Sequence, residues 1–182
     1  DWAETVREVS IDEAYLDVTD RTDWSDVRAF ARELKTEIAS TAGVTASVGV
    51  APTMSAAKVA SDHDKPDGLV VVEPGEVAAF LAPLSVEAVH GVGPVTAAEL
   101  RERDIETAGD LAAADPALLA EWFGERGRQI HRFARGEDDR AVKPRGDPKS
   151  FSRESAFTEA TTDTETQRDR VRTLAAAVAD RA

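Results

Sequence analysis

The 182-residue sequence contains no cysteine, a single tyrosine and no long apolar run. The absence of cysteine excludes disulfides, thiolate zinc sites and cysteine nucleophiles. No apolar run approaches the roughly 20 residues that a membrane-spanning helix needs, and no signal peptide is recognisable at the start. The sequence therefore predicts a soluble, cytoplasmic protein with no membrane partner.

Basic residues are also few, with 22 Lys and Arg against 35 Asp and Glu, so the net charge is −13. A nucleic-acid partner normally requires local positive charge, and the sum alone argues against one. Lysine is scarce while Ala, Val, Asp and Glu are abundant, which we interpret as salt adaptation of the whole surface. The charge is then weak evidence about the partner.

The hydrophobic pattern divides the chain near residue 73. Before it, we expect two short strands around a turn at Asp12 and Glu13, and a helix that Asp23 or Ser25 caps and Gly43 ends. A strand over residues 44–51, a short helix and another strand follow.

Residues 75–136 show no convincing strand and indicate short helices broken by proline and glycine, Gly109 among them. Residues 143–149 have the composition of a linker. Residues 151–163 indicate a strand that runs into a loop, and Thr164 can cap a last helix. The chain starts at Asp1 and stops without a helix stop signal, so we expect both ends to be cuts through a longer protein.

The stretch "SIDEAYLD", residues 10–17, places the carboxylates of Asp12 and Glu13 side by side in a strand–turn setting. Such oxygen ligands suit Mg²⁺, which keeps several waters and takes one or two carboxylates. The alternative is a solvated surface turn, which is the commoner origin of an Asp-Glu pair in an acidic chain.

A second motif, "HGVGPVTAAEL", spans residues 90–100. The glycines allow close backbone approach, and the free N–H groups at the start of a helix attract phosphate. The motif resembles a helix-hairpin-helix element, which holds a DNA backbone without reading its sequence. The alternative is an ordinary turn between two helices.

Two further groups of basic residues are candidates for phosphate contacts. Lys65 precedes a Pro-Asp-Gly turn and can act as a point charge on a phosphate, whereas Lys58 is by default a surface lysine. Arginines and lysines recur over residues 126–153. They predict either a strip that follows phosphates or a solvated helix and linker.

Taken in order, four stretches resemble a Y-family translesion DNA polymerase of the polymerase IV type over nearly the whole chain. They are "SIDEAYLD", "SVGVAPTMSAAKVASDHDKPDG", "FLAPLSVEAVHGVGPVTAAELRERDIETAGDLA" and "KSFSRES". The resemblance implies an α+β fold. It comprises an incomplete ferredoxin-like palm over residues 1–72, a small all-helical thumb with a helix-hairpin-helix over 73–142, a linker over 143–149, and the truncated start of an α/β little finger over 150–182.

The same resemblance implies template-directed DNA synthesis past damaged bases, through phosphoryl transfer assisted by two Mg²⁺ ions. Asp12 would bridge both ions, Glu13 would bind the one near the primer 3′-hydroxyl, and Ser10 would support them. Lys65 would contact the incoming triphosphate. The implied DNA contacts are Gly91, Val92, Gly93, Val95, Thr96 and Arg153. The implied partners are primer–template DNA and deoxynucleoside triphosphates, with the protein acting as a monomer, and a sliding clamp through a C-terminal tail that these residues lack.

The sequence departs from the family pattern because its 182 residues contain neither the first catalytic aspartate nor the fingers. We therefore expect the intact protein to be a polymerase and the chain alone to be inactive. Three alternatives stay open: the accessory-dependent lesion-bypass subunit of the mutagenesis response, a non-catalytic helix-hairpin-helix DNA-binding module, and an acidic structural protein.

Overall fold

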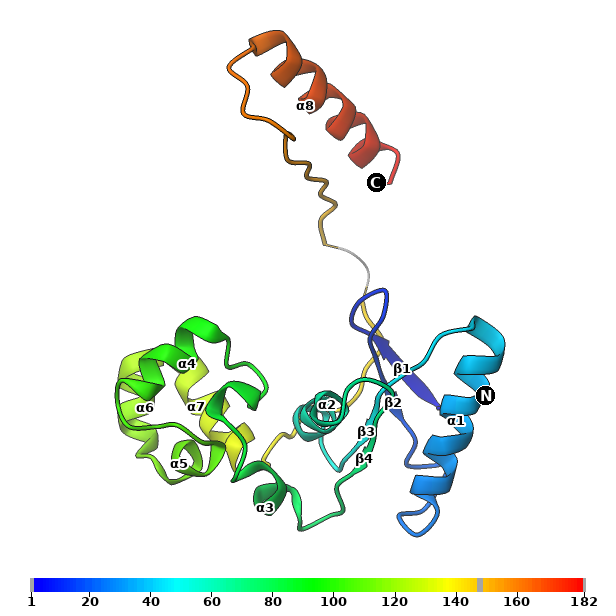
Figure 1. Ribbon diagram of the computed structural model, residues 1–182, viewed down its shortest axis with the longest axis vertical. Helices are drawn as coiled ribbons and strands as arrows, with labels where there is room; N and C mark the ends of the chain where they lie inside the picture. The colour runs from blue at the N-terminus through cyan, green and yellow to red at the C-terminus, as the bar shows by residue number, and fades with distance from the viewer. Residues whose placement is uncertain (1, 147–148, 182) are drawn as a thin grey trace. The chain divides into compact units, whose positions relative to one another are not determined.

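The computed structural model describes residues 2–146 and 149–181 (Figure 1). The chain forms two separate units, Asp1–Pro144 and Arg145–Ala182. Helices and strands occur together in the first unit, so the predicted α+β class is confirmed. Over the residues that the structure describes, no helix is both long and apolar enough to cross a membrane.

The first unit begins with the hairpin that carries the Asp-Glu pair. Strands β1 (Thr5–Glu8) and β2 (Ala14–Asp17) pair antiparallel. The loop between them is closed by the backbone N–H groups of Val9 and Ser10, which donate to the Glu13 carbonyl at 2.9 and 3.2 Å. The predicted pair of strands around a turn at this place is confirmed.

A helix and a parallel strand pair follow the hairpin. Helix α1 (Val27–Ala42) ends at Gly43, which has a left-handed φ of 68°, as predicted. The predicted cap was wrong: Asp26 is the N-cap and makes no side-chain capping bond, because the turn before it closes on the Asp23 carbonyl.

Strands β3 (Val48–Val50) and β4 (Leu69–Val71) pair in parallel, with α2 (Met54–His63) connecting them. The strand expected over residues 44–51 is therefore shorter than predicted, because only its last part has a partner strand. The two strand pairs form two separate two-stranded sheets in the described residues.

The rest of the first unit is helical, as predicted. Its helices are α3 (Val77–Leu81), the short 3₁₀ helix η1 (Val86–Ala88), α4 (Pro94–Arg101), α5 (Ala108–Ala113), α6 (Pro116–Phe123) and α7 (Glu125–Ala134). Gly109 was wrongly expected to break a helix, since it lies inside α5. A Cβ there would stand 3.0 Å from the Ala82 carbonyl oxygen, so the glycine serves close packing.

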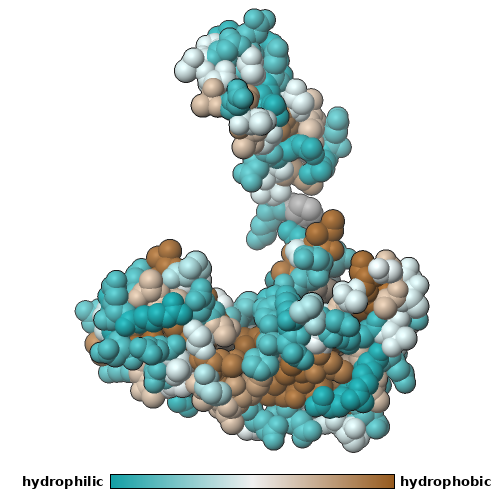
Figure 2. Space-filling view, in the orientation of Figure 1, coloured by the Kyte–Doolittle hydropathy of each residue, from teal (hydrophilic) through white to brown (hydrophobic). Residues whose placement is uncertain are grey.

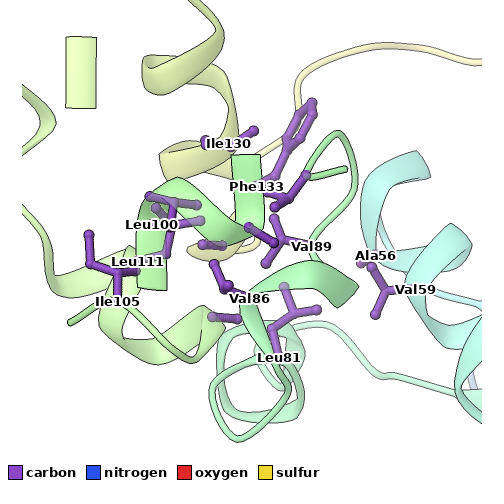
Figure 3. Close-up of a cluster of buried hydrophobic side chains, with 14 of the residues drawn as sticks. Ala56, Val59, Leu81, Val86, Val89, Leu100, Ile105, Leu111, Ile130 and Phe133 are labelled. Atoms are coloured by element: carbon purple, nitrogen blue, oxygen red, sulfur yellow. The ribbon is translucent and has the colours of Figure 1, made fainter. Parts of the chain in front are cut away.

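A hydrophobic core joins α2 to the helical part of the first unit (Figure 3). It extends from Ala56 and Val59 on α2 to Leu100, Ile130 and Phe133 in the helical part. On the face shown in Figure 2, hydrophilic residues dominate and apolar residues gather where α2 and β4 lie. The division of this unit at residue 73 stays a prediction, because α2 and the helices after it share their core.

The second unit contains one helix, α8 (Thr164–Ala179), and none of its described residues is buried. Asp163 is the N-cap and accepts hydrogen bonds from Glu165 and Thr166, so the expectation that Thr164 caps the helix was wrong by one residue. The strand expected over residues 151–163 is not formed. A strand needs a partner strand for its backbone N–H and C=O groups, and the described part of this unit contains none.

Candidate active site and nucleic-acid interface

Asp12 stands exposed on the turn between β1 and β2, where nothing forces its charge out of water. The Ser10 hydroxyl donates to its Oδ1 at 2.5 Å. This bond, followed by a backbone N–H, lowers the pKa of Asp12. The hairpin thus presents a carboxylate held by a neighbouring hydroxyl, while the metal-supporting role implied for Ser10 stays a prediction.

Glu13 has a different environment, because the Lys58 ammonium lies 2.6 Å from its Oε2. Both side chains are partly buried, 23% exposed for Lys58 and 32% for Glu13. Burial works to lower the pKa of Lys58, but the bond to Glu13 and the charge of Asp62 outweigh it and raise that pKa. Lys58 is therefore the counter-charge of Glu13.

Sequence reasoning missed this role of Lys58, which it took for a surface lysine. One signal was available: Lys58 and Asp62 stand four residues apart on α2, the spacing of helical ion pairs, and their charged atoms lie 3.3 Å apart. The contact with Glu13 joins residues 45 positions apart and leaves no local signature.

Lys65 extends the same group of charges. Its ammonium lies 2.6 Å from Asp62, and its side chain is 55% exposed. It stands at a cis peptide bond to Pro66, before Asp67 with a φ of 56°. Together with Lys58, it lowers the pKa of Asp12 electrostatically. We call the set Asp12, Glu13, Lys58, Asp62 and Lys65 the carboxylate–lysine cluster.

The donor chemistry of this cluster fits Mg²⁺ in part. Asp12 and Glu13 supply hard oxygen atoms, and Mg²⁺ binds through one or two carboxylates while keeping several waters. Among the described residues, no group of three or more His, Cys, Asp and Glu side chains converges on one point. The Lys58 ammonium is bonded to Glu13 Oε2, so its positive charge opposes a cation at the same carboxylate.

The second predicted site, at residues 91–96, forms the turn into α4. Gly91 has a φ of 88°, and Gly93 is the N-cap, followed by Pro94 at the first helical position. Val92 and Thr96 are buried, each 7% exposed, whereas Val95 is 72% exposed. The side chains of Val92 and Thr96 therefore serve the core. The surface offered to a ligand consists of backbone and the exposed side chains of Pro94 and Val95.

The structure does not bring the predicted arginine strip together as a set of free charges. Arg126 donates to the Gly91 carbonyl through Nε at 3.2 Å and Nη2 at 2.7 Å, and so braces the turn before α4. The other arginines of this part pair with carboxylates: Arg128 with Glu125, Arg132 with Asp139, Arg135 with Glu137 and Arg140 with Asp138. Arg153 is exposed in the second unit.

Comparison with known proteins connects both sites to one family. The impB/mucB/samB family matches residues 2–62, and the IMS family HHH motif matches residues 74–105. The DNA polymerase IV of Halobacterium salinarum is 63% identical over 177 residues, which are 97% of this chain and 43% of that protein. The chain belongs to the Y-family of DNA polymerases. It spans less than half the length of this curated relative.

Solved structures of the Y-family agree in fold. A Y-family DNA polymerase chimera, Dbh-Dpo4(243-245)-Dbh, has a TM-score of 0.88 at 29% identity, covering 99% of this chain and 53% of that one. An insertion ternary complex of Dbh DNA polymerase has a TM-score of 0.75 at 28% identity, with the same coverage. The first family match contains Asp12, Glu13 and Lys58, and the second contains the turn before α4.

Proposed function

We propose that this chain is part of a translesion DNA polymerase of the polymerase IV type, which extends a primer along a template past damaged bases. The observation that carries the proposal is the carboxylate–lysine cluster of a Y-family chain, where Ser10 holds the exposed Asp12, Lys58 pairs with the adjacent Glu13, and Lys65 pairs with Asp62. In this reading residues 1–72 are palm, 73–142 thumb, 143–149 linker and 150–182 the start of the little finger.

The carboxylates of the cluster would hold the metal ions of the reaction. Asp12 and Glu13 would bind Mg²⁺, two ions in the intact enzyme, which neutralise charge and activate the attacking hydroxyl in phosphoryl transfer. Ser10 keeps Asp12 Oδ1 in place through its 2.5 Å hydrogen bond. Lys65, 55% exposed, is accessible to an incoming triphosphate and can exchange Asp62 for a phosphate oxygen.

The turn before α4 is our candidate contact with the DNA backbone. The exposed N-terminus of an eight-residue helix, preceded by Gly91, Val92 and Gly93, suits a phosphate because helix starts carry free N–H groups and partial positive charge. Val95 would pack beside the backbone, and Thr96 would fix the helix from inside. Arg153 would add a basic contact from the second unit.

We propose primer–template DNA and deoxynucleoside triphosphates as partners of a monomeric, cytoplasmic enzyme. A sliding-clamp contact would need a C-terminal tail, which these 182 residues do not contain. The accessory-dependent subunit of the mutagenesis response is the second candidate, favoured by the impB/mucB/samB match. The polymerase IV type is preferred because the relative at 63% identity is a DNA polymerase IV.

The test is Asp12→Asn in the polymerase that contains this chain, assayed by primer extension with Mg²⁺. We expect turnover to fall by about 1,000-fold or more, with DNA affinity within about twofold because Asp12 would bind metal and not DNA. Asp17→Asn is the matched control: it lies on the same hairpin, and its carboxylate accepts from Thr19 instead. Unchanged extension by Asp12→Asn would show that Asp12 does not hold a metal ion of the reaction, whereas wild-type protein that binds DNA but extends no primer would favour a DNA-binding module.

A further inference from the structure

A charged pair lies directly after α7, outside the carboxylate–lysine cluster. The Asp138 side chain is 1% exposed. Arg140 donates to both of its oxygens, through Nε at 2.7 Å and Nη2 at 2.8 Å. Burial works to raise the pKa of Asp138, but Arg140 and backbone N–H groups bring it to about 2. A buried carboxylate of this kind persists only when it is fully paired.

Asp138 also has a partner far away in the sequence. The Ser55 backbone N–H, in the first turn of α2, donates to Asp138 Oδ2 at 3.0 Å across 83 positions. The α2 N-cap, Thr53, accepts from the Ala56 N–H. Side-chain oxygens of Thr53 and Asp138 thus accept from two of the backbone N–H groups in the first turn of α2. A negative charge is favourable at this end of a helix. Asp138 is a capping group supplied from the end of the helical part.

Arg140 ties the same pair to α7. Its guanidinium stacks over the Phe133 ring at 4.7 Å from the centroid, a favourable cation–π arrangement. Phe133 is 6% exposed and belongs to the core cluster shown in Figure 3. The ring centroids of Phe133 and His90 lie 5.6 Å apart, and His90 directly precedes the turn before α4. Arg140 therefore connects the core of the helical part to the carboxylate that caps α2.

The helix that Asp138 caps is the one that carries Lys58. Ser55 and Lys58 stand three residues apart on α2, so both lie on neighbouring turns of one face. On the strand side, Tyr15 lies two residues after Glu13 in β2. Burial raises the pKa of Tyr15, the charge of Glu13 raises it further, and the charges of Lys58 and Arg140 lower it.

We propose that Asp138 and Arg140 form a latch that ties the start of α2 to the end of α7 and so holds Lys58, on α2, in register with Glu13 for the polymerase reaction. The reaction part of this inference rests on the proposed function, while the mechanical part does not. Arg140 and Asp138 are positioning residues, because they act on the cluster through α2 and touch none of its side chains.

Asp138→Ala, made in the polymerase that contains this chain, removes the latch. We expect the unfolding midpoint to fall by about 10 °C, as for a broken buried ion pair. Well below that midpoint we expect kcat to fall about tenfold, with DNA affinity within about twofold, because displaced catalytic groups slow the reaction more than they weaken binding. Arg140→Lys keeps the charge but loses the paired donors, and its kcat should be intermediate.

The matched control is Asp139→Asn. It neutralises the adjacent carboxylate, whose side chain is 85% exposed and pairs with Arg132, and it should change neither kcat nor the unfolding midpoint. A purely structural role for Asp138 predicts a lower midpoint with an unchanged kcat, and that result would overturn the inference. Should Asp138→Ala fail to fold, Asp138→Asn and Arg140→Lys carry the same comparison.

Amide hydrogen exchange separates this inference from the proposed function. In Asp138→Ala, exchange should accelerate at Ser55 and Ala56 and along β2, while α5 keeps its protection. Wild-type protein that extends no primer would end the proposed function, but the exchange of α2 and β2 would still test the latch. Equal exchange at α2 and β2 in wild type and in folded Asp138→Ala would show that no latch exists.

Discussion

Asp12 and Glu13 are neighbours in the sequence, yet their carboxylates are stabilised in different ways. Asp12 is exposed and accepts from Ser10, whereas Glu13 is partly buried against Lys58. Two carboxylates with different partners can divide two roles between them, as metal sites often require. Lys58 strongly influences how readily Glu13 takes a cation, because the ammonium and the cation would carry like charges beside one carboxylate.

Lys58→Met tests this competition. The unbranched apolar side chain of methionine has a similar volume but no charge, so we expect Mn²⁺, a probe for Mg²⁺ at oxygen ligands, to bind the cluster about three- to tenfold more tightly. Stability should fall by about 1 kcal/mol, because the pair is only partly buried. Calorimetric titration and urea unfolding measure the two effects. Lys143→Met, outside the cluster, should leave both unchanged, and a weaker Mn²⁺ affinity in Lys58→Met would contradict competition.

Local sequence patterns were enough to single out Asp12, Glu13 and Lys65 as candidates, because each stands in a short motif with an interpretable turn. They could not predict the partners of Glu13 and Asp138, which lie 45 and 83 positions away. Such contacts depend on how α2 packs against the hairpin and against the segment after α7. Sequence periodicity predicts the existence of α2 but not which side chains meet at its two ends.

At the scale of elements, the turn before α4 contains two glycines that the fold needs to different degrees. Gly91 has a φ of 88°, a conformation that other residues adopt at a cost. Gly93 has a φ of −90°, and a Cβ there would meet nothing within 4 Å. The protein's own packing therefore does not require glycine at 93, and close approach of a ligand backbone would explain it.

Gly93→Ala should accordingly weaken DNA binding without unfolding the protein. We expect a loss of less than about 1 kcal/mol in stability, from the poorer N-cap alone, and a fall of about fivefold or more in affinity for primer–template DNA. Fluorescence anisotropy and urea unfolding measure the two. Gly91→Ala is the comparison, and it should lose about 1–2 kcal/mol of stability because its φ is left-handed. Undiminished DNA affinity in Gly93→Ala would argue against this turn as a DNA contact.

We expected Gly109 to break a helix, and it lies inside α5 instead. Gly127, for which no break was predicted, lies inside α7 in the same way. A Cβ at 127 would stand 1.9 Å from the Leu119 carbonyl oxygen, so α6 and α7 cross there at the backbone. A glycine that serves close packing and a glycine that serves a turn look alike in one sequence, because only the neighbouring helix distinguishes them.

At the scale of the whole molecule, the acidic surface and the proposed DNA partner impose opposite demands. With a net charge of −13, the carboxylates repel one another in the folded state. The arginines that could offset it in the helical part are largely engaged with neighbouring carboxylates or, for Arg126, with a carbonyl. Binding to DNA then has to use a few local contacts against an unfavourable long-range field, which salt weakens.

The salt dependence of folding follows from that charge. The Debye length shortens from about 10 Å at 0.1 M to about 3 Å at 1 M salt. Raising KCl over this range should therefore screen the self-repulsion and raise the thermal unfolding midpoint by about 5 °C or more. Thermal unfolding followed by circular dichroism at both KCl concentrations measures it. A midpoint that falls with KCl would contradict both self-repulsion and the interpretation of the composition as salt adaptation.

DNA affinity, measured on the same samples, should move in the opposite direction to stability. Local phosphate contacts release counterions, so the affinity for primer–template DNA should fall as KCl rises, with a log–log slope near −0.9 for each phosphate neutralised. Because the net charge is −13, screening of the general repulsion works against this trend and makes the slope shallow at low salt. A slope that is positive throughout would mean that no phosphate is neutralised by a basic side chain. Gly93→Ala should lower the affinity and leave the slope unchanged, because an uncharged backbone contact releases no counterion; a slope that Gly93→Ala makes shallower would show that the substitution also disturbs basic contacts.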